Sequence, residues 1–213
     1  PADVAPRGTV LLLHGWMMDG GSLLPWSLQL AQAGYRTISL DLRNHGRSGT
    51  APSGYGLREA RDVADAVAAL RAQGEISGPL HVMGVSYGAA TAIFSAREMG
   101  PQDDNVIAIE SFANAGGAIR AMVPHMLAKP PETIAQQVTH RMLRMQLDDA
   151  ALERAIASAG DALHLPLDKV DVGAALAQVP ACVLLLHGRD DRHVPVAHGR
   201  ALAASAPRAH YIE

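Results

Sequence analysis

A regular alternation of short apolar runs with helical patterns constrains the fold of this chain more than any other feature. Four apolar runs are bounded by turn residues, and each suits a strand that is buried on both faces. They are "TVLLLHG" (9–15), "RTISLDL" (36–42), "LHVMG" (80–84) and "NVIAIES" (105–111). Helical patterns with short connections separate the runs, which is typical of right-handed crossovers in a parallel sheet. The sequence therefore predicts an α/β fold, with a mostly parallel central sheet flanked by helices.

The alternation stops after Ser111. Residues 112–178 contain several helical stretches but no convincing strand pattern. The strand pattern resumes with "ACVLLLHG" (181–188), followed by a helix after Pro195 and the beginning of a strand in "AHYIE". At 213 residues the chain suits one domain. We expect a single domain over residues 1–213 that carries a helical cap insertion over residues 112–178.

Composition excludes several classes of protein. The net charge is −3 and the 18 lysines and arginines are scattered, so we expect no nucleic-acid partner. No apolar run is long enough for a membrane span. The single cysteine, Cys182, lies in an apolar run and reads as a buried small hydrophobe, which fits a reducing, cytoplasmic compartment. No metal-ligand spacing occurs, and we expect neither a metal nor a cofactor. The oligomeric state stays open.

The residues Gly84-Val85-Ser86-Tyr87-Gly88 form a G-x-S-x-G pattern between an apolar strand and a helix rich in small residues. A serine on such a tight strand-to-helix turn needs neighbouring glycines, and the turn presents its hydroxyl at the edge of the sheet. The helix directs its free N–H groups toward the same place, so the Tyr87 amide is the natural donor to an oxyanion. The alternative is a chance glycine-rich turn.

Two further segments resemble the α/β-hydrolase fold family. "LLLHGWMMDGG" follows the first strand and is similar to the family's His-Gly turn, which implies that the Trp16 amide is the second oxyanion donor. "DLRNHGRS" (41–48) is similar to the family's D-x-R-G-H-G-x-S stretch, with Asn44 in place of a glycine. The resemblance makes His14 and His45 either structural or pocket-lining residues.

The same resemblance indicates the acid and the base of a catalytic triad. "LLLHGRDDRHVP" (184–195) is similar to the family's acid loop and selects Asp191, with Asp190 and the more distant Glu110 as alternatives. In the family the histidine follows the last parallel strand, and here the chain ends inside that strand. We therefore expect both ends of the chain to be trimmed and the base to lie beyond Glu213. Three other histidines fit less well, because one begins the last strand and two follow the acid too closely: His210, His193 and His198.

The resemblance implies a serine hydrolase that cleaves a carboxylic ester or a related acyl compound through an acyl-enzyme at Ser86. A small apolar acyl substrate is expected, in a pocket that includes His14, Met17, Met122 and Met126. Core packing is the alternative for the helix-spaced methionines. Two other functions stay open: an acyltransferase with the same triad, and a non-catalytic ligand-binding protein of the same fold.

Overall fold

A computed structural model describes residues 5–98, 105–128, 137 and 148–213. Its centre is a six-stranded sheet in the order β2-β1-β3-β4-β5-β6, with every neighbouring pair parallel. The strands are β1 (Thr9–Leu13), β2 (Arg36–Leu40), β3 (Leu80–Val85), β4 (Asn105–Ile109), β5 (Cys182–Leu186) and β6 (His210–Ile212). Each strand lies inside the apolar run that predicted it, except that β3 extends one residue further, to Val85. The predicted α/β fold with a parallel sheet is confirmed.

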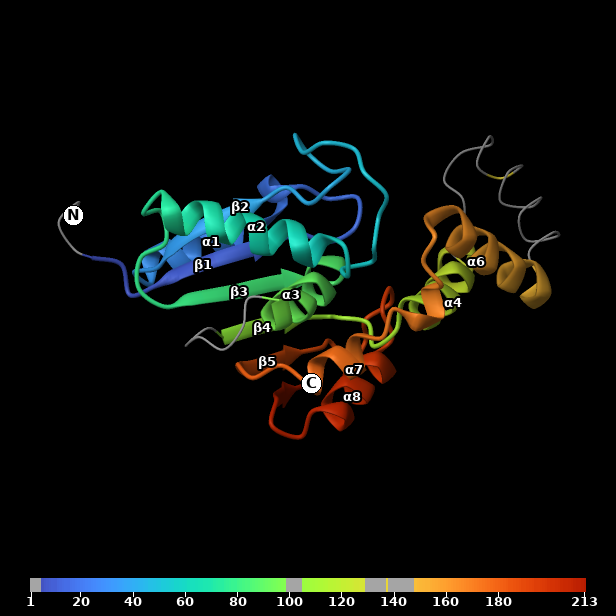
Figure 1. The fold of residues 1–213 in the computed structure, drawn as a ribbon. Coiled ribbons are helices and arrows are strands. Elements are labelled where there is room, and N and C mark those ends of the chain that lie inside the picture. The colour runs from blue at the N-terminus through green and yellow to red at the C-terminus, as the bar shows by residue number, and fades with distance from the viewer. Residues whose placement is uncertain (1–4, 99–104, 129–136, 138–147) are drawn as a thin grey trace.

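Helices cover the two faces of the sheet (Figure 1). Those of the main body are α1 (Leu24–Gln32), α2 (Glu59–Ala72), α3 (Tyr87–Glu98), α7 (Val172–Leu176) and α8 (Val196–Ser205), with the short 3-10 helices η1 (Gly20–Leu23) and η2 (Leu167–Lys169). Alternate side chains of β1 separate the two cores. Leu11 and Leu13 pack in the larger core with α2 and α3, whereas Val10 and Leu12 pack in a smaller core with Leu23.

Two helices extend beyond the carboxyl ends of the strands: α4 (Ala115–Ala128) and α6 (Asp149–Leu163) (Figure 1). The segment that carries them leaves and rejoins the main body at a narrow neck, where Asn114 and Asp171 form an isolated antiparallel bridge. The amide of Val172 donates to the Ala113 carbonyl at 2.9 Å. Beyond this neck, α7 packs against α3 as part of the larger core, although it lies within the range 112–178.

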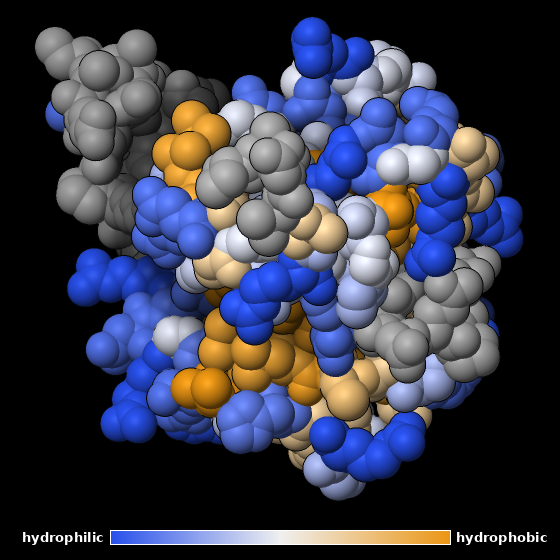
Figure 2. Space-filling model, turned by 90° about the vertical axis from the view of Figure 1, so that its left-hand side faces the viewer, coloured by the Kyte–Doolittle hydropathy of each residue, from blue (hydrophilic) through white to orange (hydrophobic). Residues whose placement is uncertain are grey.

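Apolar side chains are partly exposed on one half of the sheet. On the face that holds α1, Leu184 and Leu186 of β5 are half-buried and Ile212 of β6 is 47% exposed. Figure 2 shows a hydrophobic patch in its lower half, at the height of β4 and β5 in Figure 1. Cys182 is the first residue of β5 and is exposed, so the prediction of a buried cysteine is wrong. Strand alternation explains the error, because Val183 is buried among the helices and its neighbour Cys182 points to the opposite face.

Candidate active site

Ser86 lies at the predicted strand-to-helix turn, between β3 and α3. Its φ of 52° is in the left-handed region, which non-glycine residues seldom adopt. Its amide donates to the Ile109 carbonyl of β4 at 2.8 Å, which fixes the turn to the sheet. A Cβ on Gly84 would overlap the carbonyl of Gly88, and a Cβ on Gly88 would overlap the carbonyl of Leu13. Both glycines are therefore required by the close approach of α3 to the sheet.

The loop after β1 lies beside the start of α3. The indole of Trp16 stacks on the Tyr55 ring, with centroids 5.7 Å apart and an interplanar angle of 9°. Its edge contacts the Tyr87 ring, with centroids 5.0 Å apart. These contacts bring together Trp16 and Tyr87, the two residues whose amides are predicted to bind an oxyanion. Tyr87 is also the first residue of α3, so its N–H has no partner within the helix.

The two histidines near this loop have different exposures but similar contacts. His14 is fully buried, as its structural alternative expects. Its Nε2 accepts from the Leu42 amide at 3.0 Å, and its Nδ1 lies 2.8 Å from the Gly15 carbonyl oxygen. Burial lowers the pKa of His14, and the Gly15 hydrogen bond only partly opposes this effect. His45 is half-buried, and its Nε2 accepts from the Met17 amide at 3.1 Å.

Asp191, the predicted acid, is a buried carboxylate of which only one oxygen is hydrogen-bonded. Its side chain is 4% exposed, whereas Asp190 is an exposed residue. One oxygen, Oδ1, accepts from the amides of His193 at 2.7 Å and Val194 at 3.1 Å. The other oxygen, Oδ2, is buried and has no hydrogen-bond partner among the described residues. Buried polar atoms without partners are rare, so Oδ2 is suited to accept from a further donor.

Glu110 belongs to the same edge of the sheet. It follows β4 directly, has a φ of 53°, and its amide donates to the Leu186 carbonyl at 2.8 Å. Burial raises the pKa of its carboxyl, and the charge of Asp191 adds to the effect. A Cβ on Gly188 would lie 3.3 Å from Glu110 Oε1 and 4.0 Å from the Asp191 amide nitrogen, so the alternative acid lies near the favoured one.

Four described histidines follow β5, and no ring nitrogen among them is hydrogen-bonded to Asp191 Oδ2. His187 is buried, and its Nε2 lies 3.6 Å from Asp191 Oδ2 but 2.8 Å from the Val194 carbonyl oxygen. The His193 ring is 65% exposed, with Nδ1 3.9 Å from Asp191 Oδ1. His198 accepts at Nδ1 from the Ala113 amide at 3.3 Å, which ties α8 to the neck of the insertion. His210 opens β6 and pairs with Leu184 in the middle of β5, so it does not belong to the strand ends that Ser86 follows.

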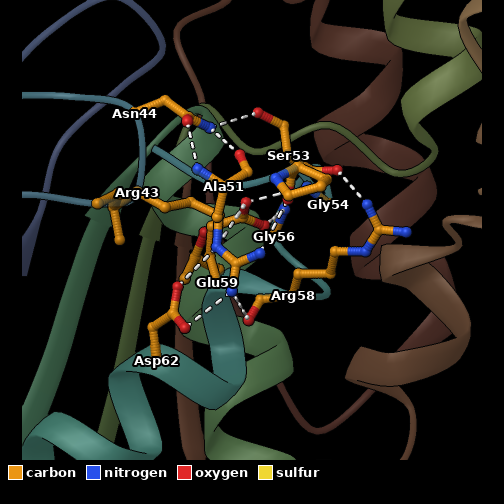
Figure 3. Close-up of polar contacts among 12 residues, drawn as sticks. Arg43, Asn44, Ala51, Ser53, Gly54, Gly56, Arg58, Glu59 and Asp62 are labelled. Carbon is orange, nitrogen blue, oxygen red and sulfur yellow. Dashed lines mark hydrogen bonds and ion pairs between the residues drawn. The ribbon is translucent and has the colours of Figure 1, made fainter. Parts of the chain in front are cut away.

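A polar network holds the loop between β2 and α2 (Figure 3). Glu59 is fully buried, and its carboxylate accepts from the amides of Gly54 at 2.9 Å and Gly56 at 2.8 Å. Arg43 forms a two-pronged ion pair with Asp62, with N–O distances of 2.7 and 2.8 Å. Such fork-shaped pairing fixes geometry as well as charge.

The same loop is pinned at two further points (Figure 3). Asn44 has a φ of 66°, which explains why a residue tolerant of the left-handed region occupies this place. Its side chain donates to the Ala51 carbonyl at 2.6 Å and accepts from the Ala51 amide at 2.8 Å. Arg58 donates to the Ser53 carbonyl at 3.0 Å and to the Leu163 carbonyl of α6 at 2.6 Å. Arg58 therefore connects this loop to the end of α6.

An open cavity of about 700 Å³ lies between the loop after β1 and the loop after β2. Its lining includes Trp16, Met17, Met18, Asn44 and His45. The three apolar members are unusually exposed, with 44% of Trp16, 85% of Met17 and 42% of Met18 accessible.

The other predicted pocket residues lie elsewhere or cannot be placed. Met122 is half-buried and packs against the larger core, which agrees with its alternative role in packing. The Met126 side chain falls outside the described part of the chain.

Sequence reasoning missed two buried polar residues of the site. Glu59 lies one helical turn before Val63 and two before Val67, so it shares their buried face, and this spacing is a readable signal. His187 follows the last residue of β5, at the same edge where Ser86 follows β3. Within the described residues, no group of three or more His, Cys, Asp or Glu side chains could hold a metal ion. None of the described helices is long and apolar enough to cross a bilayer.

Comparisons with known proteins agree with this fold. AB hydrolase superfamily protein YisY of Bacillus subtilis is 27% identical, over 91% of this chain and 78% of its own length. A monoacylglycerol lipase of Mycolicibacterium smegmatis is 26% identical, over 94% and 76%. The esterase Pf2001 of Pyrococcus furiosus superposes with a TM-score of 0.69 at 19% identity, over 97% of this chain and 72% of that one. The enol-lactonase of Burkholderia xenovorans superposes with a TM-score of 0.66 at 20% identity, over 100% and 84%. A profile of the alpha/beta hydrolase family matches residues 10–213, and the chain belongs to that family.

Proposed function

We propose that this chain forms the core of a serine esterase that acts on small apolar acyl esters through an acyl-enzyme at Ser86. The observation that carries the proposal is the pairing of two features at one sheet edge. Ser86 is held in a left-handed turn at the start of α3, and Asp191 offers a buried, unpartnered oxygen after β5. A relative named as a lipase and a fold neighbour named as an esterase support the same class of chemistry.

In the proposed reaction, the Ser86 hydroxyl attacks the ester carbonyl while an imidazole base removes its proton. The carbonyl oxygen becomes an oxyanion, which accepts hydrogen bonds from the Trp16 and Tyr87 amides. Collapse of the tetrahedral intermediate expels the alcohol, which takes the proton from the imidazolium. Water then attacks the acyl-enzyme by the same route and releases the acid.

The base is the part of the proposed triad that the described residues leave unassigned. An imidazole that donates to Asp191 Oδ2 would satisfy this orphan oxygen and be oriented by it. The nearest histidine, His187, has its Nε2 closer to the Val194 carbonyl than to Asp191. The proposal therefore keeps the expectation of a histidine that follows the last strand.

The proposed preference for apolar acyl groups rests on the cavity beside the loop after β1. Trp16, Met17 and Met18 expose apolar surface to it, and methionine adapts to ligands of irregular shape. A charged acyl group gains little binding energy from this apolar surface. Asp19 also lines the cavity, and its negative charge disfavours anionic acyl groups. The acyl chain is accordingly proposed to be neutral and apolar.

A panel of p-nitrophenyl esters of increasing acyl length tests the proposal, with the protein isolated from its natural source. We expect saturable hydrolysis of short and medium apolar esters and none by the Ser86→Ala variant. A competing alcohol acceptor in the same assay distinguishes water from acyl transfer, since a transferase would yield mainly the new ester. Saturable binding of these esters without any turnover would instead favour the non-catalytic binding protein.

A further inference from the structure

His45 makes two hydrogen bonds that define its protonation state. The Met17 amide can only donate, so the Nε2 atom that lies 3.1 Å from it must carry a lone pair. The Nδ1 atom lies 2.8 Å from the Arg43 carbonyl oxygen, which can only accept. Both contacts are satisfied together by a single form, the neutral imidazole with its proton on Nδ1.

The Met17 amide needs such a partner. Met17 has a φ of 58°, a conformation that is unfavourable for a residue with a side chain. Its side chain is 85% exposed, so burial contributes little to hold it in place. Within the loop itself, the Met18 amide donates to the Gly15 carbonyl at 3.2 Å. The bond to His45 therefore fixes the backbone at the residue directly after Trp16.

His14 has the same pair of contacts as His45 but is fully buried. Its Nε2 accepts from the Leu42 amide, and its Nδ1 lies 2.8 Å from the Gly15 carbonyl oxygen, so it too is neutral with its proton on Nδ1. The two imidazole rings are in edge contact, with centroids 5.0 Å apart. Two neutral imidazoles thus bridge the loop after β1 to the loop after β2.

The charged groups around the pair leave this neutral form in place. Asp41 lies close enough to interact with His14, but its oxygens accept from the amides of Gly20 at 2.7 Å and Arg47 at 2.9 Å. Asp19 also interacts with His14. The Trp16 and Tyr87 rings also lie against the His45 ring, with centroids 5.5 and 6.0 Å away. Among the described residues, no carboxylate is hydrogen-bonded to either imidazole.

We propose that His45 is a positioning residue, which holds the Trp16 amide in place for the oxyanion through a neutral imidazole bridge to Met17. This inference rests on the proposed function for its catalytic consequence, but the bridge itself does not. Its effect acts on the transition state more than on substrate binding, because the oxyanion forms only during the reaction.

The bridge can be tested without any enzyme activity. Nitrogen-15 NMR of histidine-labelled protein distinguishes a protonated ring nitrogen from one with a lone pair. We expect the His45 resonances, assigned by their loss in His45→Gln, to show a proton on Nδ1 and a lone pair on Nε2. Loss of the acceptor in His45→Leu should also shift the Met17 amide resonance. A proton on Nε2 at neutral pH, or an unchanged Met17 amide, would overturn the proposal.

The catalytic consequence is tested by a matched set of variants. Glutamine retains an acceptor near the position of Nε2, whereas leucine retains only bulk. We expect His45→Leu to lower kcat by about 10- to 100-fold, less than the 10²- to 10³-fold typical of losing an oxyanion donor outright. KM should change little, and His45→Gln should recover most of the loss.

The control removes another half-buried histidine at the far edge of the sheet, where His81 of β3 contacts Asn105. His81→Gln should keep kcat even if it lowers stability. Equal kcat values for His45→Leu and wild type would overturn the positioning role. If wild type hydrolyses no ester, the proposed function fails, and the NMR measurement still decides the bridge.

Discussion

At the residue scale, a buried carboxylate oxygen without a partner is unfavourable unless a donor binds to it. Asp191 Oδ2 is such an oxygen, and it belongs to the residue that the sequence pattern selects as the acid. Ser86 and Glu110 add two strained backbone conformations at the same sheet edge. Strain of this kind persists where the surrounding structure enforces it, and it is frequent at functional sites.

Asp191→Asn tests the role of the acid. The amide keeps the shape of the side chain but removes the charge that stabilises an imidazolium, so we expect kcat with an ester to fall by about 10⁴-fold, as in serine proteases. The matched control is Asp190→Asn, because Asp190 is adjacent and exposed. Steady-state kinetics should show little change in this control. Equal losses in both variants would contradict the assignment of the acid.

The buried histidines make stability depend on pH. Burial lowers the pKa of His14 below the ordinary value of 6.5, so the unfolded chain takes up this proton more readily than the folded chain. The stability that neutral His14 contributes is present above about pH 6.5 and is lost as the pH falls toward the folded pKa. The slope reaches at most about 1.4 kcal/mol per pH unit for one such group. His198, whose pKa burial also lowers, adds a loss of the same sign.

Urea unfolding between about pH 7.5 and 5.5 measures this dependence. We expect His14→Gln to show a shallower decline in the free energy of unfolding than wild type. Subtracting the two curves removes the opposite contribution of Glu110, whose raised pKa favours stability at lower pH. Parallel curves for the two proteins would contradict the account of His14.

At the scale of elements, the site depends on how closely α3 approaches β1 and β3. Gly88 faces the carbonyl of Leu13, and Gly84 faces the carbonyl of Gly88, so the start of the helix touches the sheet backbone directly. This contact places the Tyr87 amide at the strand ends, next to the loop that carries Trp16. Because backbone atoms are in contact here, an added side chain could not be accommodated by moving a flexible side chain.

Gly88→Ala should therefore destabilise the protein more than the same substitution at a surface glycine. The added methyl group would overlap the Leu13 carbonyl, so the cost should exceed the 1–3 kcal/mol that is typical of overpacking. Gly49→Ala is the control, because nothing lies within 4 Å of its added Cβ. Thermal and urea unfolding of the two variants measure the difference. Similar stability in both would show that α3 can move away from the sheet.

At the scale of the whole molecule, one arginine ties α6 to the main body near the site. Arg58, beside the start of α2, donates to the last carbonyl of α6, at Leu163. Residue His164, which ends α6, has a φ of 48°, so this helix end gains from an external donor. Farther from the sheet, Arg120 of α4 forms ion pairs with Glu153 of α6 and with Asp168. These pairs are exposed and contribute little to the free energy of unfolding.

Arg58→Met should loosen this end of α6. Without the donor, the last turn of α6 loses a hydrogen bond to the main body, so we expect faster amide hydrogen exchange around Leu163 and unchanged exchange in β3 and β4. Arg61→Met, which removes an exposed arginine from the same helix, is the control. Unchanged exchange around Leu163 in Arg58→Met would mean that other contacts hold this end of α6.

Much of the fold could be predicted from the sequence because period and turn residues are local signals. All six strands and the Ser86 turn followed from apolar runs and adjacent glycines. The burial of Cys182 could not be predicted, since it depends on which face of β5 the helices cover. The bridges made by His14 and His45 also depend on two loops that meet only in the folded chain.

The most direct test of the central claim is the reaction of Ser86 with a fluorophosphonate, which phosphonylates activated serines. The protein isolated from its natural source would be exposed to the reagent and its intact mass and peptide map recorded, with Ser86→Ala in parallel. The account predicts one adduct, on the peptide that contains Ser86, and none in the variant. A folded wild-type protein with no adduct on Ser86 would contradict the claim that this serine is a catalytic nucleophile.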